Sequence, residues 1–308
     1  MTDTQTQDGQ NTLHTPVLLQ EVIELLNVAP TDTIVDGTAG GGGHLTVLLS
    51  RLGPEGRYVA IDADATALDR VRERVGQDNR VSYVCGNFRH MVQHLQDVGV
   101  DSVDKVLLDL GLSSDQLEGE SGRGFSFTRD EPLSMTLKAQ TAEGELTAWH
   151  VVNEWDETSL AGIIYGFGGE PRARGIARVI CARREEQPIE SSLELAQLIE
   201  DAMGRRGKRH PATRTFQAIR MAVNDELGAL SEGLEEARHL LRDGGRIAVI
   251  TFHGLEDRIV KRAFREWAKE GDGVVLTKHP IPPQRSEVLT NPRARSAKVR
   301  CFQKVKTQ

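Results

Sequence analysis

The chain has 308 residues, of which 38% are hydrophobic and 27% are charged, and its formal net charge is -7. This length fits one large domain or one domain that carries an insertion, and no apolar run approaches the roughly 18 residues of a membrane span. We therefore expect no membrane protein, and any nucleic-acid partner has to be bound by local basic patches.

The start of the chain and its cysteines indicate the compartment. Residues 1–12 are polar and lack the features of a secretory signal, so we expect a disordered tail there. The three cysteines, Cys85, Cys181 and Cys301, lie far apart without any C-x-x-C spacing, which argues against a disulfide framework and a zinc knuckle. We expect no bound metal and a reducing, cytoplasmic location.

The first third of the chain has the pattern of a parallel sheet. Apolar residues recur at helical spacing from Pro16 to Val28, which predicts a leading helix. Short apolar runs then alternate with helix-length segments, as in repeated βαβ units. The expected strands are Thr33–Val35, Tyr58–Ile61, Val81–Val84 and Val103–Leu108.

After Leu112 this rhythm breaks. Helical periodicity follows at Thr158–Phe167, Arg174–Arg184 and Leu193–Met203, without a convincing buried strand. The α/β pattern returns with a long helix from about Thr213 to Leu241, a strand Arg246–Phe252, a helix from Glu256 to about Lys269, and two further strands at Val274–Leu276 and Lys298–Val305. We predict an α/β fold in which residues 13–112 and 213–308 form one sheet domain, interrupted by an inserted helical domain at 113–212.

A glycine cluster, residues 37–43, follows the first expected strand and precedes His44. Ligands of doubly wound sheets bind at this edge, and glycines let a ligand lie against the backbone. The spacing does not satisfy G-x-G-x-x-G, and no Lys-Ser or Lys-Thr follows to make a P-loop. The cluster therefore suggests a nucleotide-like ligand but disfavours a dinucleotide or a phosphate cradle.

Three further side chains come at the ends of successive expected strands. Asp62 can accept hydrogen bonds from both hydroxyls of a ribose, Phe88 can pack against an adenine, and Asp109 has the equivalent position after the fourth strand. Each could instead be a strand cap or a core residue, but their succession favours a binding site. His44 could contact the ligand, bond at the helix start or be solvated, and we assign it ligand contact only.

The ordered motifs of the chain resemble those of the bacterial small-subunit rRNA methyltransferase H family, also called MraW, over nearly the whole length. The motifs are residues 14–18, 36–38, 42–44, 109–117, 123–127, 215–220, 223–227, 252–258 and 291–298. The resemblance implies a Rossmann-like class I sheet that binds S-adenosylmethionine and N4-methylates a decoding-centre, P-site cytidine of 16S rRNA. It also implies the small ribosomal subunit as partner, and a homodimer stays open.

The family's cofactor contacts, carried over position by position, fall on Gly42, Gly43, His44, Asp62, Phe88, Asp109 and Gln116. Asp109 is also the candidate catalytic residue, because the cytosine amine is a poor nucleophile and an acceptor for its proton should help. Its rival role is to hold the cofactor, which leaves the proton to backbone carbonyls or water. Covalent C5 chemistry is disfavoured, since the only cysteine beside a strand-end motif, Cys85, lies inside an expected strand.

Two basic clusters contain almost no acids and are predicted to neutralise RNA phosphates, with the acceptor cytidine flipped out of its stack. A third cluster, residues 172–184, fits a solvated helix face equally well. The predicted RNA-binding residues are Arg205, Arg206, Lys208, Arg209 and Arg214 in the first cluster, and Arg293, Arg295 and Lys298 in the second.

One departure from the family pattern leaves a second hypothesis open. The family usually reads Pro-Leu-Asp-Met-Arg where this chain has Ser134 and Thr136 in place of the acid and the base. A catalytically impaired RNA-binding or ribosome-assembly protein would keep the cofactor fold without turnover. A nucleotide-dependent oxidoreductase is a third hypothesis, disfavoured by the failed dinucleotide spacing.

Overall fold

The computed structural model describes residues 16–112, 122–204 and 210–305. Within them, seven strands form one sheet with the order β3-β2-β1-β4-β5-β7-β6. The strands are β1 (Thr33–Asp36), β2 (Arg57–Asp62), β3 (Val81–Cys85), β4 (Val103–Asp109), β5 (Leu241–Thr251), β6 (Gly273–Val275) and β7 (Lys298–Lys304). Strands β1 to β5 are parallel, and β7 runs antiparallel to β5 and β6.

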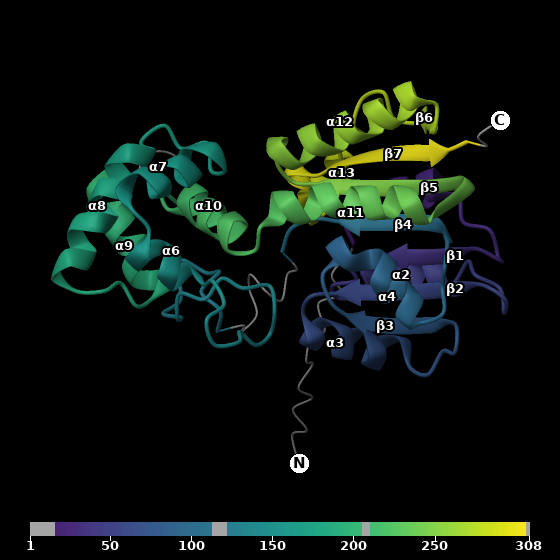
Figure 1. The fold of residues 1–308 in the computed structure, drawn as a ribbon, viewed down its shortest axis with the longest axis horizontal. Coiled ribbons are helices and arrows are strands. Elements are labelled where there is room, and N and C mark those ends of the chain that lie inside the picture. The colour runs from purple at the N-terminus through teal and green to yellow at the C-terminus, as the bar shows by residue number, and fades with distance from the viewer. Residues whose placement is uncertain (1–15, 113–121, 205–209, 306–308) are drawn as a thin grey trace, which may run out of the picture.

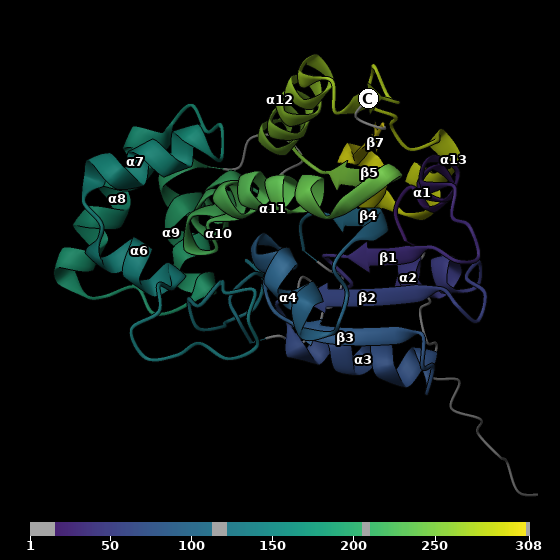
Figure 2. The same ribbon diagram turned by 45° about the vertical axis from the view of Figure 1, so that its right-hand side comes forward.

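Helices cover both faces of this sheet (Figures 1 and 2). They are α1 (Leu19–Leu26), α2 (Gly43–Leu49), α3 (Ala65–Val75), α4 (Met91–Asp97), α11 (Glu226–Leu240), α12 (Gly254–Glu270) and α13 (Arg285–Thr290), with short 3₁₀ helices η1 (Phe88–His90) and η2 (Pro292–Ser296). Ile34 of β1 packs with α1 to α3, and the next residue, Val35, packs with α4, α11 and α12. Because β1, β2 and β4 are buried on both faces, each contains the continuous apolar run that the sequence suggested.

A second group of helices lies beside the sheet, on the side toward which the parallel strands point (Figure 1). Its members are α6 (Ala148–Glu154), α7 (Glu157–Gly166), α8 (Ala173–Glu186), α9 (Ser192–Met203) and α10 (Thr213–Val223). They share their own apolar core, which includes Ile164, Ile176, Leu195 and Phe216. The predicted fold class, an α/β sheet with inserted helices, is confirmed.

The expected single helix from Thr213 to Leu241 is wrong. The helix is interrupted between α10 and α11, where Asp225 has a left-handed backbone with φ 44°. Phe216 and Ile219 of α10 pack in the core of the helical group, whereas Leu230 and Leu234 of α11 pack against the sheet. Two helices with differently directed apolar faces therefore replace one, and the helical group extends to Val223.

Candidate functional site

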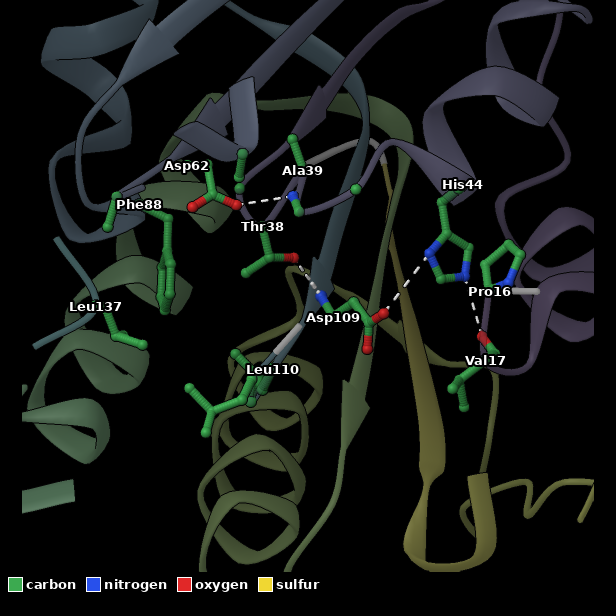
Figure 3. A pocket seen from close by; sticks show the side chains of 18 of the residues that line it. Pro16, Val17, Thr38, Ala39, His44, Asp62, Phe88, Asp109, Leu110 and Leu137 are labelled. Atoms are coloured by element: carbon green, nitrogen blue, oxygen red, sulfur yellow. Dashed lines mark hydrogen bonds and ion pairs between the residues drawn. The ribbon is translucent and has the colours of Figure 1, made fainter. Parts of the chain in front are cut away.

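A cavity of about 450 Å³ opens at the carboxyl ends of the parallel strands (Figure 3). Small-molecule sites typically have volumes of about 300–1,000 Å³. The glycine loop, Asp62, Phe88 and Asp109 line it from the sheet, while Leu137 and Asn224 line it from segments that lead to the helical group. The cavity thus lies at the reversal of strand order between β1 and β4, where doubly wound sheets bind their ligands.

The glycine loop is fixed by backbone hydrogen bonds to the neighbouring strands. The N–H of Gly37 donates to Leu107 O, at 3.0 Å, and that of Ala39 donates to Ile61 O, at 3.0 Å. Gly40 has φ 51°, a conformation that side chains rarely adopt. Gly40 and Gly43 line the cavity.

Gly42, predicted to contact the cofactor, packs against α3. It is buried, and a Cβ on it would contact Val71 of α3 at 3.2 Å. It also does not belong to the cavity lining. Its contribution to the loop is the left-handed turn, with φ 73°, from which α2 begins.

Asp62 ends β2 and presents its carboxylate to the cavity (Figure 3). Its Oδ2 accepts a hydrogen bond from Gly40 N, at 2.7 Å, and its Oδ1 accepts one from Asp64 N, at 2.8 Å. Burial raises the pKa of Asp62 to about 6, although these two N–H groups oppose the shift. Each oxygen keeps a lone pair for a further donor, so the carboxylate can accept both hydroxyls of a ribose.

Phe88 begins η1 and is partly buried at the cavity wall. Its ring is held against α11, since a Cβ at Gly233 would collide with it. Figure 3 shows the ring near Leu137. The two apolar groups provide a surface on which a flat aromatic base can pack.

His44 is buried on the opposite side of the cavity, and its Nε2 lies 3.0 Å from Val17 O. A carbonyl only accepts, so Nε2 carries the proton and Nδ1 carries a lone pair. Burial lowers the pKa of His44 to about 4, which keeps the ring neutral at physiological pH. Its Nδ1 is 3.6 Å from Asp109 Oδ2, too far for a hydrogen bond.

Asp109 has a carboxylate oxygen without a hydrogen-bond partner in the described part of the chain. Its backbone N–H donates to Thr38 Oγ1, at 2.6 Å, but its buried Oδ1 makes no hydrogen bond with any described residue. Burial raises the pKa of Asp109 well above its usual range, and the negative charges of Asp36 and Glu256 add to the shift. A buried oxygen without a partner destabilises a protein, so its place in a cavity wall indicates a ligand group that bonds to it.

Several residues of the wall carried no predicted role. Glu256 at the start of α12 is 3% exposed and accepts the N–H groups of Phe252 and His253, at 2.8 and 3.2 Å. Glu226 receives two hydrogen bonds from Arg220, at 2.6 and 2.8 Å. Both acids belong to motifs of the family resemblance, but nothing in their spacing shows that the fold brings them to this cavity.

Two side chains hold Leu137 at the cavity. Asn224 Nδ2 donates to Met135 O, at 2.7 Å, and Asn224 Oδ1 accepts from Leu137 N, at 2.8 Å. Arg123 donates to Leu137 O, at 2.8 Å, and to Asp64 Oδ2, at 2.7 Å. The segment 123–137 is therefore tied both to the α10–α11 junction and to the residues that follow β2.

Ser134 and Thr136 lie outside the cavity lining. Their hydroxyl oxygens are 3.0 Å apart, and Thr136 is also 3.2 Å from Thr141 Oγ1. An acid and a base at these positions would face each other as an ion pair. In this chain a contact between two hydroxyl groups stands in place of that ion pair. The hypothesis of a catalytically impaired protein gains no support from these positions.

The predicted RNA-binding residues are only partly described. Arg293 lines the cavity, Arg295 is exposed nearby in η2, and Lys298 begins β7 opposite Thr251, at the same edge of the sheet. Arg214 is exposed on α10 and lies 3.4 Å from Glu170 Oε2. Gln116, Arg205, Arg206, Lys208 and Arg209 lie outside the described residues.

The part of the chain that the structure describes has neither a metal-binding cluster nor a membrane-spanning helix. Residues 16–112, 122–204 and 210–305 contain no group of three or more His, Cys, Asp or Glu side chains arranged to hold a metal ion. No helix in the same ranges is both long and apolar enough to cross a membrane.

Known proteins match this chain over nearly its whole length. A family model described as the MraW methylase family matches residues 11–305. A protein of Deinococcus deserti named ribosomal RNA small subunit methyltransferase H is 47% identical over 307 residues, which cover 98% of this chain and 97% of that protein. A protein of the same name from Brevibacillus brevis is 43% identical over 311 residues, which cover 95% of this chain and 98% of that protein.

We expect the affinity for S-adenosylmethionine to fall at acid pH. Asp62 accepts ribose hydroxyls best as a carboxylate, and lowering the pH through about 6 protonates it. The dissociation constant should therefore rise by up to about tenfold for each pH unit below that value. Calorimetric titration between pH 8 and pH 5 measures this. The Asp62→Asn variant should bind more weakly and without this pH dependence; an equally steep dependence in that variant would exclude Asp62 as the cause.

We also expect Ser134 and Thr136 to be energetically coupled. Thr136 is 6% exposed, so the Thr136→Arg variant buries a cation without a partner and should lose roughly 3 kcal/mol of unfolding free energy. Adding Ser134→Asp should recover part of this loss, because the two side chains are neighbours. Urea unfolding of both single variants and the double variant measures the coupling, and simple additivity would show that the positions are independent.

Proposed function

This chain belongs to the MraW methylase family, and we propose that it transfers a methyl group from S-adenosylmethionine to N4 of a P-site cytidine in 16S ribosomal RNA. Membership of the family confirms the resemblance seen in the sequence motifs. The cofactor is S-adenosylmethionine, and the enzyme is a methyltransferase. We further propose that it acts in the cytoplasm on the small ribosomal subunit; a homodimer stays a prediction.

The observation that carries this proposal is the convergence of Asp62, Phe88 and Asp109 on one cavity. Asp62 accepts the ribose hydroxyls, and Phe88 packs against the adenine. Gly43 and His44 border the same cavity on the side of α2, next to Asp109. Bound S-adenosylmethionine supplies an electrophilic methyl group, so catalysis comes mainly from positioning the acceptor amine in line with it.

Asp109 is the proposed proton acceptor. As the new carbon–nitrogen bond forms, the exocyclic amine loses one proton. Asp109 lines the cavity where that amine has to enter, and its Oδ1 makes no hydrogen bond with a described residue. A raised pKa makes a carboxylate a stronger base. The same oxygen could instead hold the cofactor. Loss of a proton acceptor would slow methyl transfer, whereas loss of a cofactor contact would weaken cofactor binding.

The helical group is proposed to recognise RNA, as an inserted unit at residues 113–212 that continues into α10. Arg214 is exposed on this group, and Arg293, Arg295 and Lys298 lie at the cavity edge of the sheet. The cations at the cavity edge can neutralise phosphates next to a flipped-out cytidine, and Arg214 can contact phosphates further along the RNA.

Methyl transfer to rRNA is the direct test. Purified protein is incubated with labelled S-adenosylmethionine and small ribosomal subunits that lack the modification, and the digested rRNA is examined by mass spectrometry. We expect N4-methylcytidine at the decoding centre, and no transfer to fully modified subunits. Methylation of another nucleoside would overturn the proposed specificity, and no transfer despite cofactor binding would overturn the proposed activity.

The Asp109→Asn variant distinguishes the two roles of Asp109. If Asp109 accepts the proton, kcat should fall by about 100-fold or more, while the affinity for S-adenosylhomocysteine changes little. The wild-type kcat should also rise with pH, since the raised pKa leaves Asp109 protonated at low pH, and the variant should lose this rise. A weaker affinity with an unchanged kcat would instead identify Asp109 as a cofactor ligand.

A further inference from the structure

A basic strip runs along the outer face of α12, apart from the clusters discussed above. Its members are all exposed: Arg258, Lys261, Arg262, Arg265 and Lys269. At 3.6 residues per turn, all five fall within an arc of about 100°. Val260, Phe264 and Trp267 are buried on the other side of the helix.

The charges of this basic strip are not balanced by ion pairs within the described residues. None of the five cations forms a salt bridge there, whereas other surface arginines such as Arg89 and Arg238 do. The exposed acids of α12, Glu266 and Glu270, lie beside the strip, and Glu270 is already bound by Arg238. The strip is therefore a continuous source of positive potential on a protein of net charge -7.

A second cavity, of about 230 Å³, adjoins the basic strip. Its lining residues are Lys261, Phe264, Arg265, Val275, Lys278 and Arg300. Arg300 is neutralised by Asp257, with hydrogen bonds of 2.7 and 3.1 Å. Lys261, Arg265 and Lys278 line this cavity from two different segments, and no carboxylate of a described residue belongs to the lining, so the local positive charge favours an anion there.

We infer that the basic strip and this cavity bind backbone phosphates of the RNA substrate, away from the nucleotide that is methylated. The inference rests on the proposed function. Glu256, at the start of α12, lines the cofactor cavity, and Lys261 and Arg265 lie about 8 and 14 Å further along the helix axis at 1.5 Å per residue. An RNA strand with its acceptor nucleotide in the cofactor cavity can thus continue along α12.

The chemistry of the strip favours RNA over a protein partner. Protein interfaces are centred on buried aromatic or aliphatic anchors. The outer face of α12 exposes no large hydrophobic side chain, and Phe264 at the cavity floor is 1% exposed. What the surface offers is a row of cations at successive helical turns, which suits a chain of regularly spaced phosphates.

The test compares two double variants with equal loss of charge. Lys261→Ala with Arg265→Ala removes two cations of the second cavity. Arg51→Ala with Arg57→Ala is the control. Both residues are exposed near the amino-terminal ends of the parallel strands, at the edge of the sheet opposite the cofactor cavity. Binding to naked 16S rRNA and to small subunits is measured over a salt series. Neither pair lines the cofactor cavity, so affinity for S-adenosylhomocysteine should remain unchanged in both variants.

We expect the α12 variant to bind naked rRNA about tenfold more weakly at low salt, with a slope of log affinity against log salt that is smaller by about 1.4 to 1.8. The control should keep the wild-type slope. An α12 variant with the wild-type slope overturns the inference while leaving the proposed function intact. A loss seen with subunits but not with naked rRNA also overturns it, because the strip then contacts a ribosomal protein. Wild-type protein that binds neither naked rRNA nor small subunits overturns the proposed function itself.

Discussion

The reversal of strand order between β1 and β4 is the constraint on which the site depends. The chain leaves β1 toward β2 and β3 on one side and returns to β4 on the other, so no connection crosses the carboxyl ends of β1 and β4. The glycine loop directly follows β1, and Asp109 is the last residue of β4. Helices on both faces shield the same edge from water, which raises the pKa of Asp36 and Asp62 to about 6. One arrangement of strands thus provides both the cavity and its electrostatics.

The sheet alone does not complete the cavity. Leu137 comes from the segment before the helical group, and its position depends on Asn224 and Arg123. Arg123 also bonds to Asp64, whose backbone N–H donates to Asp62. A continuous set of hydrogen bonds therefore joins the carboxylate at the end of β2 to the segment that leads into the helices. The position of Leu137 and the position of the Asp62 carboxylate are linked through these few contacts.

The sequence predicted those parts of the molecule whose signal is local. The central strands β1, β2 and β4 were recognisable because burial on both faces makes them apolar runs. Asp62, Phe88 and Asp109 were recognisable because they stand at or shortly after the ends of expected strands. The interruption between α10 and α11 was not predicted, because the left-handed residue there is Asp225 and not a glycine. Glu226 and Glu256 were missed as cavity residues because only the packing of α11 and α12 against the sheet brings them there. For Gly42, the local signal of the glycine cluster suggested a cofactor contact. In the structure this glycine forms the turn before α2 and faces α3.

The insertion also has a consequence for how the chain is made. β4 and β5 pair directly, from Lys105 opposite Arg246 to Asp109 opposite Ile250, yet α6 to α10 all lie between them in sequence. During synthesis the helical core can form from nearby segments, while β4 stays without its neighbour until β5 has emerged. A nascent chain therefore carries folded helices beside an incomplete sheet in which β4 is an additional open edge. Open edges recruit other strands, so this interval is the one in which a chaperone would protect the protein most.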